Sequence, residues 1–484
     1  MSESTPADST APHSTAPHTT APDGPLDLLI RTRRAILGGD PDAAEQAVLV
    51  GVKDGTVVLV RPWDPARPDT GDPASDHEGD ATEVIELAED EVLLPGLVDS
   101  HVHVNEPGRT EWEGFASATR AAAAGGVTTI IDMPLNSIPS TVTVEALREK
   151  QDVARDQVVV DVGFWGGAVP DHLGDIEAMH EAGVFGFKCF LADSGVQEFP
   201  HLDGPTFARA MEETARVGAL MIVHAEDADS LAGCTPASGN HYSDFLASRS
   251  SEAEGKAVQR VIDEARRTGG RAHVLHLSAA DAVPLLAQAR AEGIDISVET
   301  CPHYATLAAE DIPDGATQFK CCPPIREKGN QDRLWTALED GVIDMIVSDH
   351  SPSTADLKCF DSGDFGVAWG GISSVQVGLP AVWNEAKIRE VPLAHVVQWM
   401  ATAPAERVGL TSKGRIAEGM DADLVIFAPD EEWDVDVTRL FHKNQVSAYA
   451  DRHLAGAVRR TLLRGIPVTD DSAPSGRLLQ RGQA

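Results

Sequence analysis

The chain has 484 residues, of which 42% are hydrophobic, and this length suits a large globular domain with a smaller one. Aspartate and glutamate number 76 against 39 lysines and arginines, and the formal charge of -37 repels nucleic-acid phosphates and anionic lipid surfaces. We therefore expect no nucleic-acid and no membrane partner. The sequence has no long apolar run, no secretory signal pattern and no Cys-x-x-Cys pair among its cysteines, which predicts reduced thiols in a cytoplasmic protein.

The two ends of the chain differ in pattern from its middle. Residues 1–24 are rich in Ser, Thr, Pro and Ala, with a short repeat, and predict a disordered tail. Short apolar segments bounded by Gly and Asp predict strands at 26–31, 47–52 and 55–60, and again at 414–427 and 457–468. The acidic, Pro-rich residues 64–80 predict an exposed loop. We expect a composite β-sandwich domain built from 25–96 and 411–470, followed by a C-terminal tail over 471–484.

Between residues 97 and 410, apolar strands alternate with amphipathic helices. Strands are predicted at 97–103, 127–133, 158–165, 184–190, 219–224, 272–277, 294–300 and 344–348, and helices at 111–124, 143–155, 206–217, 252–267 and 279–292, among others. Eight strands alternating with helices predict an α/β fold, a (β/α)8 barrel of the TIM type. A doubly wound open sheet is the alternative, but no Gly-x-Gly-x-x-Gly turn or Walker A loop follows any strand.

Polar side chains follow the carboxyl ends of five of these strands, where a barrel places its chemistry. They are His101 and His103 on the first strand, Lys188 on the fourth, His224 on the fifth, His276 on the sixth and Asp349 on the eighth. Residues two apart in a strand point to the same face, so His101 and His103 can leave the strand in one direction. Each residue alone is more simply explained as an ordinary hydrogen-bonded, capping or solvent-reaching side chain. Their shared position on one rim predicts a metal site.

Lys188 is the unusual member of this set, because a protonated amine would be repelled by metal ions. Burial depresses the pKa of a lysine. A neutral lysine amine can take up carbon dioxide to form a carbamate, whose two oxygens can bridge two cations.

The set of ligand candidates resembles that of the binuclear amidohydrolase superfamily, and within it most closely the allantoinase family, over about residues 26–468. The similar segments include Asn105-Glu-Pro-Gly-Arg-Thr-Glu-Trp, Asp132-Met-Pro-Leu-Asn136, Gly186-Phe-Lys-Cys-Phe-Leu, Glu299-Thr-Cys-Pro-His-Tyr304, Lys320-Cys-Cys-Pro-Pro-Ile-Arg, Ser348-Asp-His-Ser-Pro and Trp369-Gly-Gly-Ile. The resemblance implies two divalent metal ions per subunit. His101 and His103 would bind one, His224 and His276 the other, carboxylated Lys188 would bridge them, and Asp349 would be both ligand and proton shuttle. Zinc suits these ligands, with iron, cobalt or manganese as alternatives.

The same resemblance implies substrate contacts at Asn105, Asn136, Cys322 and Gly371, although Asn and Gly at such positions are equally typical of turns. Dihydroorotase-like relatives carry an arginine where this chain has Asn105, which favours a neutral ureide as substrate. Cys322 stands where many relatives have serine. A homotetramer is also implied by the resemblance.

The function expected from the resemblance is hydrolysis of the cyclic amide bond of allantoin to give allantoate. A hydantoinase or dihydropyrimidinase is the first alternative, because its rings present the same amide. Some dihydropyrimidinase relatives act as non-catalytic interaction proteins, but they have lost their metal ligands. This chain keeps all six ligand candidates, which favours an enzyme.

Overall fold

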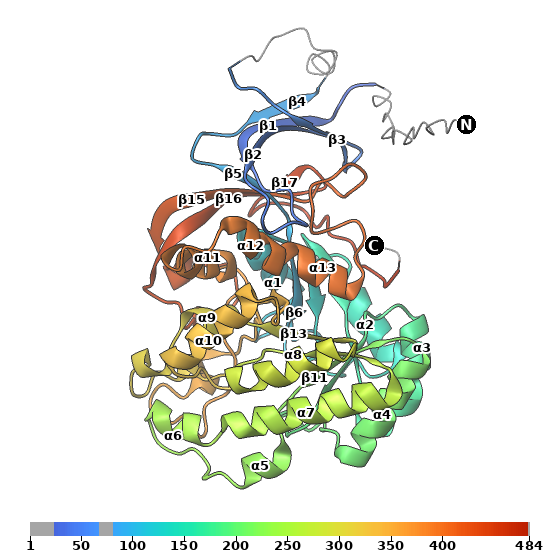
Figure 1. Ribbon diagram of the computed structural model, residues 1–484, viewed down its shortest axis with the longest axis vertical. Helices are drawn as coiled ribbons and strands as arrows, with labels where there is room; N and C mark the ends of the chain where they lie inside the picture. The colour runs from blue at the N-terminus through green and yellow to red at the C-terminus, as the bar shows by residue number, and fades with distance from the viewer. Residues whose placement is uncertain (1–23, 67–80, 483–484) are drawn as a thin grey trace, which may run out of the picture.

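The computed structural model describes residues 24–66 and 81–482, which form a sheet built from both ends of the chain above a larger barrel (Figure 1). The predicted tail and most of the predicted acidic loop fall on residues 1–23 and 67–80, which lie outside the described residues. No helix in the described ranges is long and apolar enough to cross a membrane.

Strands from both termini share one sheet of eight strands. Its order is β17 (Ile466–Val468), β16 (His453–Leu463), β15 (Leu424–Asp434), β5 (Val92–Pro95), β1 (Leu28–Ala35), β2 (Gln46–Lys53) and β3 (Thr56–Pro62), with β4 (Glu83–Glu86) paired to β1. The two ends meet where β15 runs antiparallel to β5 and pairs Leu424 with Pro95. A separate sheet made of terminal strands was predicted and is confirmed. The predicted domain limits remain a prediction.

The barrel consists of parallel strands, and it confirms the fold class predicted from the sequence. Its strands are β6 (Leu97–Val102), β7 (Val127–Asp132), β8 (Asp161–Phe164), β9 (Gly166–Gly167), β10 (Phe187–Phe190), β11 (Leu220–His224), β12 (Arg271–Val274), β13 (Ile296–Thr300) and β14 (Met345–Ile346). Only Trp165 separates β8 from β9, so these two segments occupy one position in the ring. The ring closes where the backbone N–H of His103 donates to the carbonyl of His350 at 2.8 Å.

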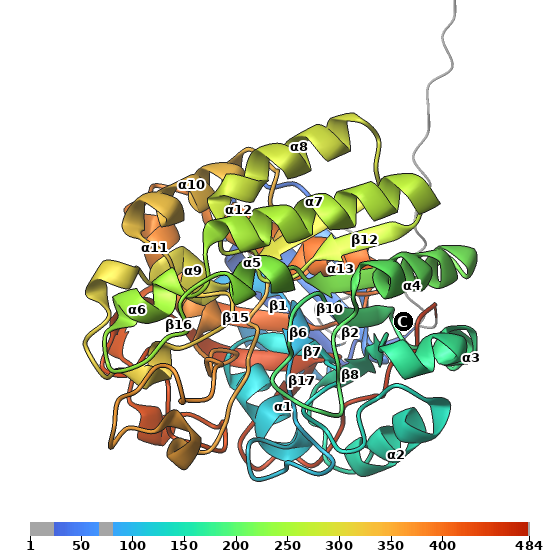
Figure 2. The same cartoon turned by 90° about the horizontal axis from the view of Figure 1, so that it is seen from below.

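Helices surround the strands, as the view from below shows (Figure 2). They are α1 (Phe115–Ala124), α2 (Val144–Ala154), α3 (Ile176–Glu181), α4 (Gly204–Arg216), α5 (Ala228–Ala232), α6 (Tyr242–Ala247), α7 (Ser251–Thr268), α8 (Val283–Ala291), α9 (Pro302–Thr306), α10 (Lys328–Glu339), α11 (Gly378–Ile388), α12 (Leu393–Val397) and α13 (Ala403–Val408). In α4 the carboxylate of Asp203 caps the first turn by accepting from the N–H of Thr206. Phe207, Ala210 and Met211 are spaced to share one face, which is buried.

A buried ion cluster joins the terminal sheet to the barrel. The Nζ of Lys413 lies 2.8 Å from Asp161 of β8, 3.0 Å from Asp421 and 2.7 Å from Asp423, which precedes β15. Arg464, between β16 and β17, also pairs with Asp161 at 2.8 Å. Part of the segment predicted as a C-terminal tail runs beside β8, near this ion cluster, where Leu478 forms a parallel β-bridge with Val162. These contacts fix the sheet relative to the barrel strands.

Candidate metal centre and substrate cavity

His101, His103 and Asp349 bring three ligand atoms together at the carboxyl end of the barrel. The Nε2 of His101 lies 3.1 Å from Oδ1 of Asp349, without a hydrogen bond of good geometry, and the Nε2 of His103 lies 3.5 Å from the same oxygen. The three ligand atoms lie within 4.8 Å of one another, and all three residues are buried. His101 lies on β6 and His103 directly follows it, while Asp349 follows β14, which is the neighbour of β6 across the closure of the barrel.

His224 and His276 form a second pair beside the first group. The Nδ1 of His224 lies 2.9 Å from the Nε2 of His276, and the other nitrogen of His224, Nε2, lies 2.8 Å from the carboxylate of Glu226. Glu226 is fully buried and is also paired with Arg249, so it fixes the imidazole of His224 in one orientation. The Nδ1 of His224 and the Nε2 of His276 are therefore the nitrogens of this pair that lie close enough to share one ion.

The carboxylate of Glu299 orients His101, as Glu226 orients His224. Oε1 of Glu299 lies 2.5 Å from Nδ1 of His101 and accepts the backbone N–H of His276 at 3.2 Å. Oε2 of Glu299 lies 2.9 Å from Nε2 of His273, whose Nδ1 lies 2.6 Å from the hydroxyl of Ser297. Because Glu299 accepts a hydrogen bond from Nδ1 of His101, Nε2 is the nitrogen that faces Asp349, and it carries the lone pair whenever the ring is neutral.

Lys188 lies on β10, lines the same cavity as His103, His224 and Asp349, and is 1% exposed. Its Nζ makes no ion pair with a described carboxylate and lies 4.9 Å from the ring centre of Phe190. Burial lowers the pKa of Lys188 to about 8, although the charges of Asp349 and Glu299 oppose this effect. The amine is therefore deprotonated far more readily than that of an exposed lysine.

The histidines have different electrostatic surroundings. Burial, reinforced by the charge of Lys188, lowers the pKa of His103 well below the ordinary value, and burial does the same for His276. Burial also lowers the pKa of His101, but Asp349 and Glu299 outweigh it and raise the pKa to about 9. Burial raises the pKa of Asp349, yet the neighbouring histidines hold it well below the usual range, so this carboxylate is ionised at neutral pH.

These residues fit divalent metal ions. Buried ligand atoms of His101, His103 and Asp349 converge at one position, His224 Nδ1 and His276 Nε2 lie 2.9 Å apart as a second pair, and the buried Nε2 of His101 has no hydrogen-bond partner. Imidazole and carboxylate ligands suit zinc and related divalent ions. Five strand ends contribute, and the structure brings together all six ligand candidates predicted from the sequence.

The same rim opens into a cavity of about 530 Å³. Asn136, Cys322 and Gly371, three of the four predicted substrate contacts, line it together with His103, Lys188, His224, His276 and Asp349. Asn105 does not line the cavity; it is fully buried, its amide donates to the carbonyl of Pro352 at 3.3 Å, and its Oδ1 has no partner. A direct contact between Asn105 and a substrate remains a prediction.

Several residues of the site were not predicted from the sequence, chiefly the orienting carboxylates Glu226 and Glu299 and the cavity residues Arg249 and Lys320. Glu226 stands two residues after His224, and Glu299 opens one of the segments that carry the family resemblance. Those positions were a usable signal for an orienting carboxylate. Arg249 precedes α7, far from any strand end, and no sequence pattern predicted its place in the cavity.

Comparison with known proteins agrees with this geometry. The amidohydrolase family matches residues 92–466. An allantoinase from Streptomyces avermitilis is 53% identical over 459 residues, which cover 94% of this chain and 99% of that protein. An allantoinase from Saccharomyces cerevisiae is 46% identical over 77% of this chain and 82% of its own length. Among solved structures, the L-hydantoinase (dihydropyrimidinase) from Arthrobacter aurescens has a TM-score of 0.84 at 29% identity, covering 94% of this chain and all of that one.

Proposed function

Because the chain belongs to the amidohydrolase family and groups within it with the allantoinases, we propose that it hydrolyses the cyclic amide bond of allantoin to give allantoate. The observation that carries the proposal is that four histidines, a lysine and an aspartate lie beside a cavity of about 530 Å³, which all of them except His101 line. A hydantoinase activity is the related alternative, since a hydantoinase shares the whole fold with this chain.

We propose that two divalent ions, zinc in the first instance, are held by His101 and His103 on one side, by His224 and His276 on the other, and by Asp349 and carboxylated Lys188. When bound, such a pair of ions supplies a Lewis acid for the ring carbonyl and lowers the pKa of the attacking water to about 7. The Lys188 ammonium, with its pKa of about 8, first loses one proton; the neutral amine then adds to carbon dioxide and releases a second proton as the carbamate forms. The carbamate replaces a positive charge with a negative one at the centre.

Asp349 is the proposed proton carrier. Its carboxylate is ionised and lies at the cavity surface, so it can accept a proton from the attacking water at an oxygen. The same carboxyl group then returns the proton to the ring nitrogen as the carbon–nitrogen bond breaks. The Nε2 atoms of His101 and His103 lie 3.1 and 3.5 Å from the same oxygen of this carboxylate. Gly371 and Cys322 line the same cavity, in which the ring of the substrate would be received.

The test combines metal analysis with substrate comparison on the purified protein. We expect about two metal ions per chain, loss of activity on chelation and recovery on adding metal back. Allantoin should be hydrolysed far better than dihydroorotate, because Asn105 stands where dihydroorotase-like relatives carry an arginine. A fully active metal-free preparation contradicts the metal mechanism. Turnover of hydantoin or dihydrouracil equal to or above that of allantoin transfers the assignment to the hydantoinases.

The homotetramer and the cytoplasmic location expected from the sequence are retained as proposals. All six cysteines are free thiols, which supports a reducing compartment. The mass of the purified protein in solution, measured by light scattering, decides between a tetramer and smaller assemblies.

A further inference from the structure

One wall of the cavity carries two cations that the metal centre does not use. Arg249 and Lys320 both line the cavity, together with Cys322. Apart from Asp349, the acidic lining residue is Asp193, which is exposed. This wall is therefore rich in hydrogen-bond donors, although the protein as a whole is strongly acidic.

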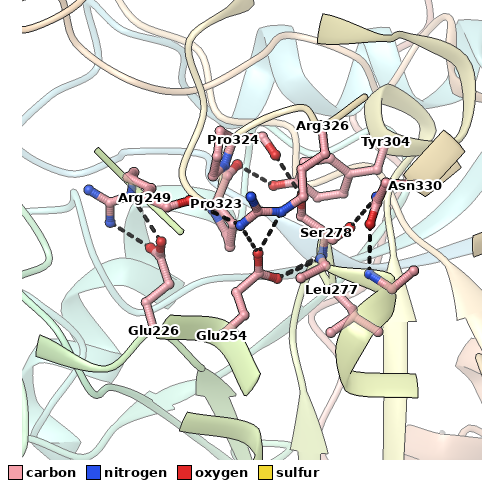
Figure 3. A network of polar contacts seen from close by, with 12 residues as sticks. Glu226, Arg249, Glu254, Leu277, Ser278, Tyr304, Pro323, Pro324, Arg326 and Asn330 are labelled. Atoms are coloured by element: carbon pink, nitrogen blue, oxygen red, sulfur yellow. Dashed lines mark hydrogen bonds and ion pairs between the residues drawn. The ribbon is translucent and has the colours of Figure 1, made fainter. Parts of the chain in front are cut away.

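Arg249 is held so that one edge of its guanidinium stays available. Its Nε and Nη2 donate to the two oxygens of Glu226 at 3.0 and 2.5 Å, and Figure 3 shows this two-pronged contact. Its third nitrogen, Nη1, makes no hydrogen bond to any described residue. The side chain is 21% exposed, and Arg249 lies on the cavity lining. A guanidinium fixed in this way presents its remaining donors without losing further side-chain entropy.

Lys320 is a buried ammonium without an acidic partner. Its Nζ donates to the carbonyl of Ala368 at 2.6 Å and more weakly to that of Gly366 at 3.4 Å, and it lies 5.3 Å from the ring centre of Phe245. It makes no ion pair with a carboxylate in the described part of the chain. An ammonium has three donors, so one remains for the cavity. Burial of a charge without a counter-ion is costly, which indicates a use for this group beyond packing.

A network behind the wall keeps it rigid (Figure 3). Arg326 donates from Nε and Nη2 to Oε1 of Glu254 at 3.1 and 2.5 Å, and Nη2 also donates to the backbone carbonyl of Arg249 at 3.2 Å. Oε2 of Glu254 accepts the backbone N–H of Ser278 at 3.0 Å, and the Ser278 hydroxyl donates to the carbonyl of Pro324 at 2.6 Å. Ser278 follows His276 by two residues. The loop that bears Cys322 and the backbone of Arg249 are thus fixed to the strand end that carries a metal-ligand candidate.

We propose that Arg249 and Lys320 form the subsite for the ureido substituent of the substrate, donating hydrogen bonds to its carbonyl oxygen while the ring amide lies at the metal centre. A ureido group is neutral, and its oxygen is a strong acceptor that two charged donors suit well. Hydantoin and dihydrouracil have no group to place there. The inference rests on the proposed function and goes beyond it, because it names the residues that select substituted rings.

The test compares allantoin with unsubstituted hydantoin in metal-loaded enzyme carrying Lys320→Met, a change that keeps length and packing against Phe245. We expect kcat/KM for allantoin to fall about tenfold to a hundredfold, mostly through KM, and kcat/KM for hydantoin to change by less than about twofold. Lys320→Arg, which keeps a charged donor, should retain most of the preference for allantoin.

Lys358→Met is the matched control. Lys358 is also a buried lysine, and it donates to the carbonyls of Trp369 and Gly371 at 3.1 and 2.6 Å, but it does not line the cavity. Its removal loosens the same loop without removing a cavity donor. We therefore expect Lys358→Met to lower kcat/KM for the two substrates by similar factors.

The outcomes separate the two proposals. Equal losses for both substrates in Lys320→Met, or no loss for allantoin, overturn the subsite while the allantoinase activity of the wild type stands. A wild type that hydrolyses hydantoin but not allantoin overturns the proposed function and the subsite together. If the wild type hydrolyses neither, the proposed function is wrong. Binding alone then tests the subsite, measured as the increase in Tm with ligand concentration. The wild type should bind allantoin more tightly than hydantoin, and Lys320→Met should weaken the binding of allantoin but not that of hydantoin.

Discussion

Replacing Glu299 by glutamine tests whether this carboxylate prepares His101 for metal binding. Glu299 is 1% exposed and receives three hydrogen bonds, from His101, from His273 and from the backbone N–H of His276. Glutamine has the same shape but only one acceptor oxygen. Its amide nitrogen would face either His273, or His101 together with the backbone N–H of His276, so at least one buried hydrogen bond is lost.

The size of the effect follows from this mismatch. A buried donor left without its acceptor costs about 1–3 kcal/mol. If His101 bears the loss, its ring can turn or change tautomer, and an orienting partner of this kind is typically worth about tenfold to a hundredfold in metal affinity. Burial raises the pKa of Glu299, but His101 outweighs it and lowers the pKa to about 2. The contribution of ionised Glu299 to the stability of the fold is therefore fully present above its unfolded pKa of about 4.3 and is lost as pH falls toward 2.

The assay is metal retention during dialysis against a graded series of chelator concentrations, with unfolding by urea measured in parallel. Glu299→Gln should lose metal at a chelator concentration about tenfold to a hundredfold below that for the wild type. Glu254→Gln is the matched control, because Glu254 is equally buried but pairs with Arg326 and touches no ligand candidate. It should lower stability and leave metal retention near that of the wild type. Equal metal retention in Glu299→Gln and the wild type would refute the reasoning.

Three further changes test other parts of the structure. Lys188→Ala should reduce the metal content to one ion per chain or fewer and lower activity by orders of magnitude. Formate or acetate with excess metal should partly restore its activity, but should not restore that of Asp349→Ala. Two retained ions and full turnover in Lys188→Ala would contradict the bridging role of Lys188. Lys413→Met should lower the free energy of unfolding by about 3–5 kcal/mol, because three carboxylates lose their shared cation, against less than about 1 kcal/mol for the exposed ion pair removed by Lys387→Met. Burial lowers the pKa of Lys413, but the aspartates outweigh burial and raise the pKa above its ordinary value. The stabilisation by Lys413 should therefore persist below pH about 10.4 and disappear only as pH rises through the raised pKa. Loss of this stabilisation already at pH 8 would contradict the prediction. Gly371→Ala would place a Cβ 2.2 Å from the carbonyl oxygen of Ser351 at a φ of +122°, so kcat/KM should fall at least about tenfold, whereas Gly370→Ala, whose nearest neighbours are 3.9 Å away, should cost much less.

Sequence alone was sufficient to predict the barrel and the set of ligand candidates. Parallel strands alternating with helices place every strand's carboxyl end on one rim, so His101, His224 and Asp349 could be grouped although they are far apart in the chain. The spacing of two between His101 and His103 fixes a common face by local geometry alone. The terminal strands could be assigned to one separate sheet because their pattern differs from that of the middle.

The tertiary structure alone decided which side chains support those ligand candidates and which form the far wall of the cavity. Glu299 reaches His101 across 198 residues of sequence, and Arg249 reaches the cavity from the segment before α7. The pairing of β5 with β15 and the course of residues 471–482 beside β8 are likewise non-local. Periodicity encodes which face of an element is buried, but the partner of a buried polar group depends on distances between loops, which are set only when all the strands are in place.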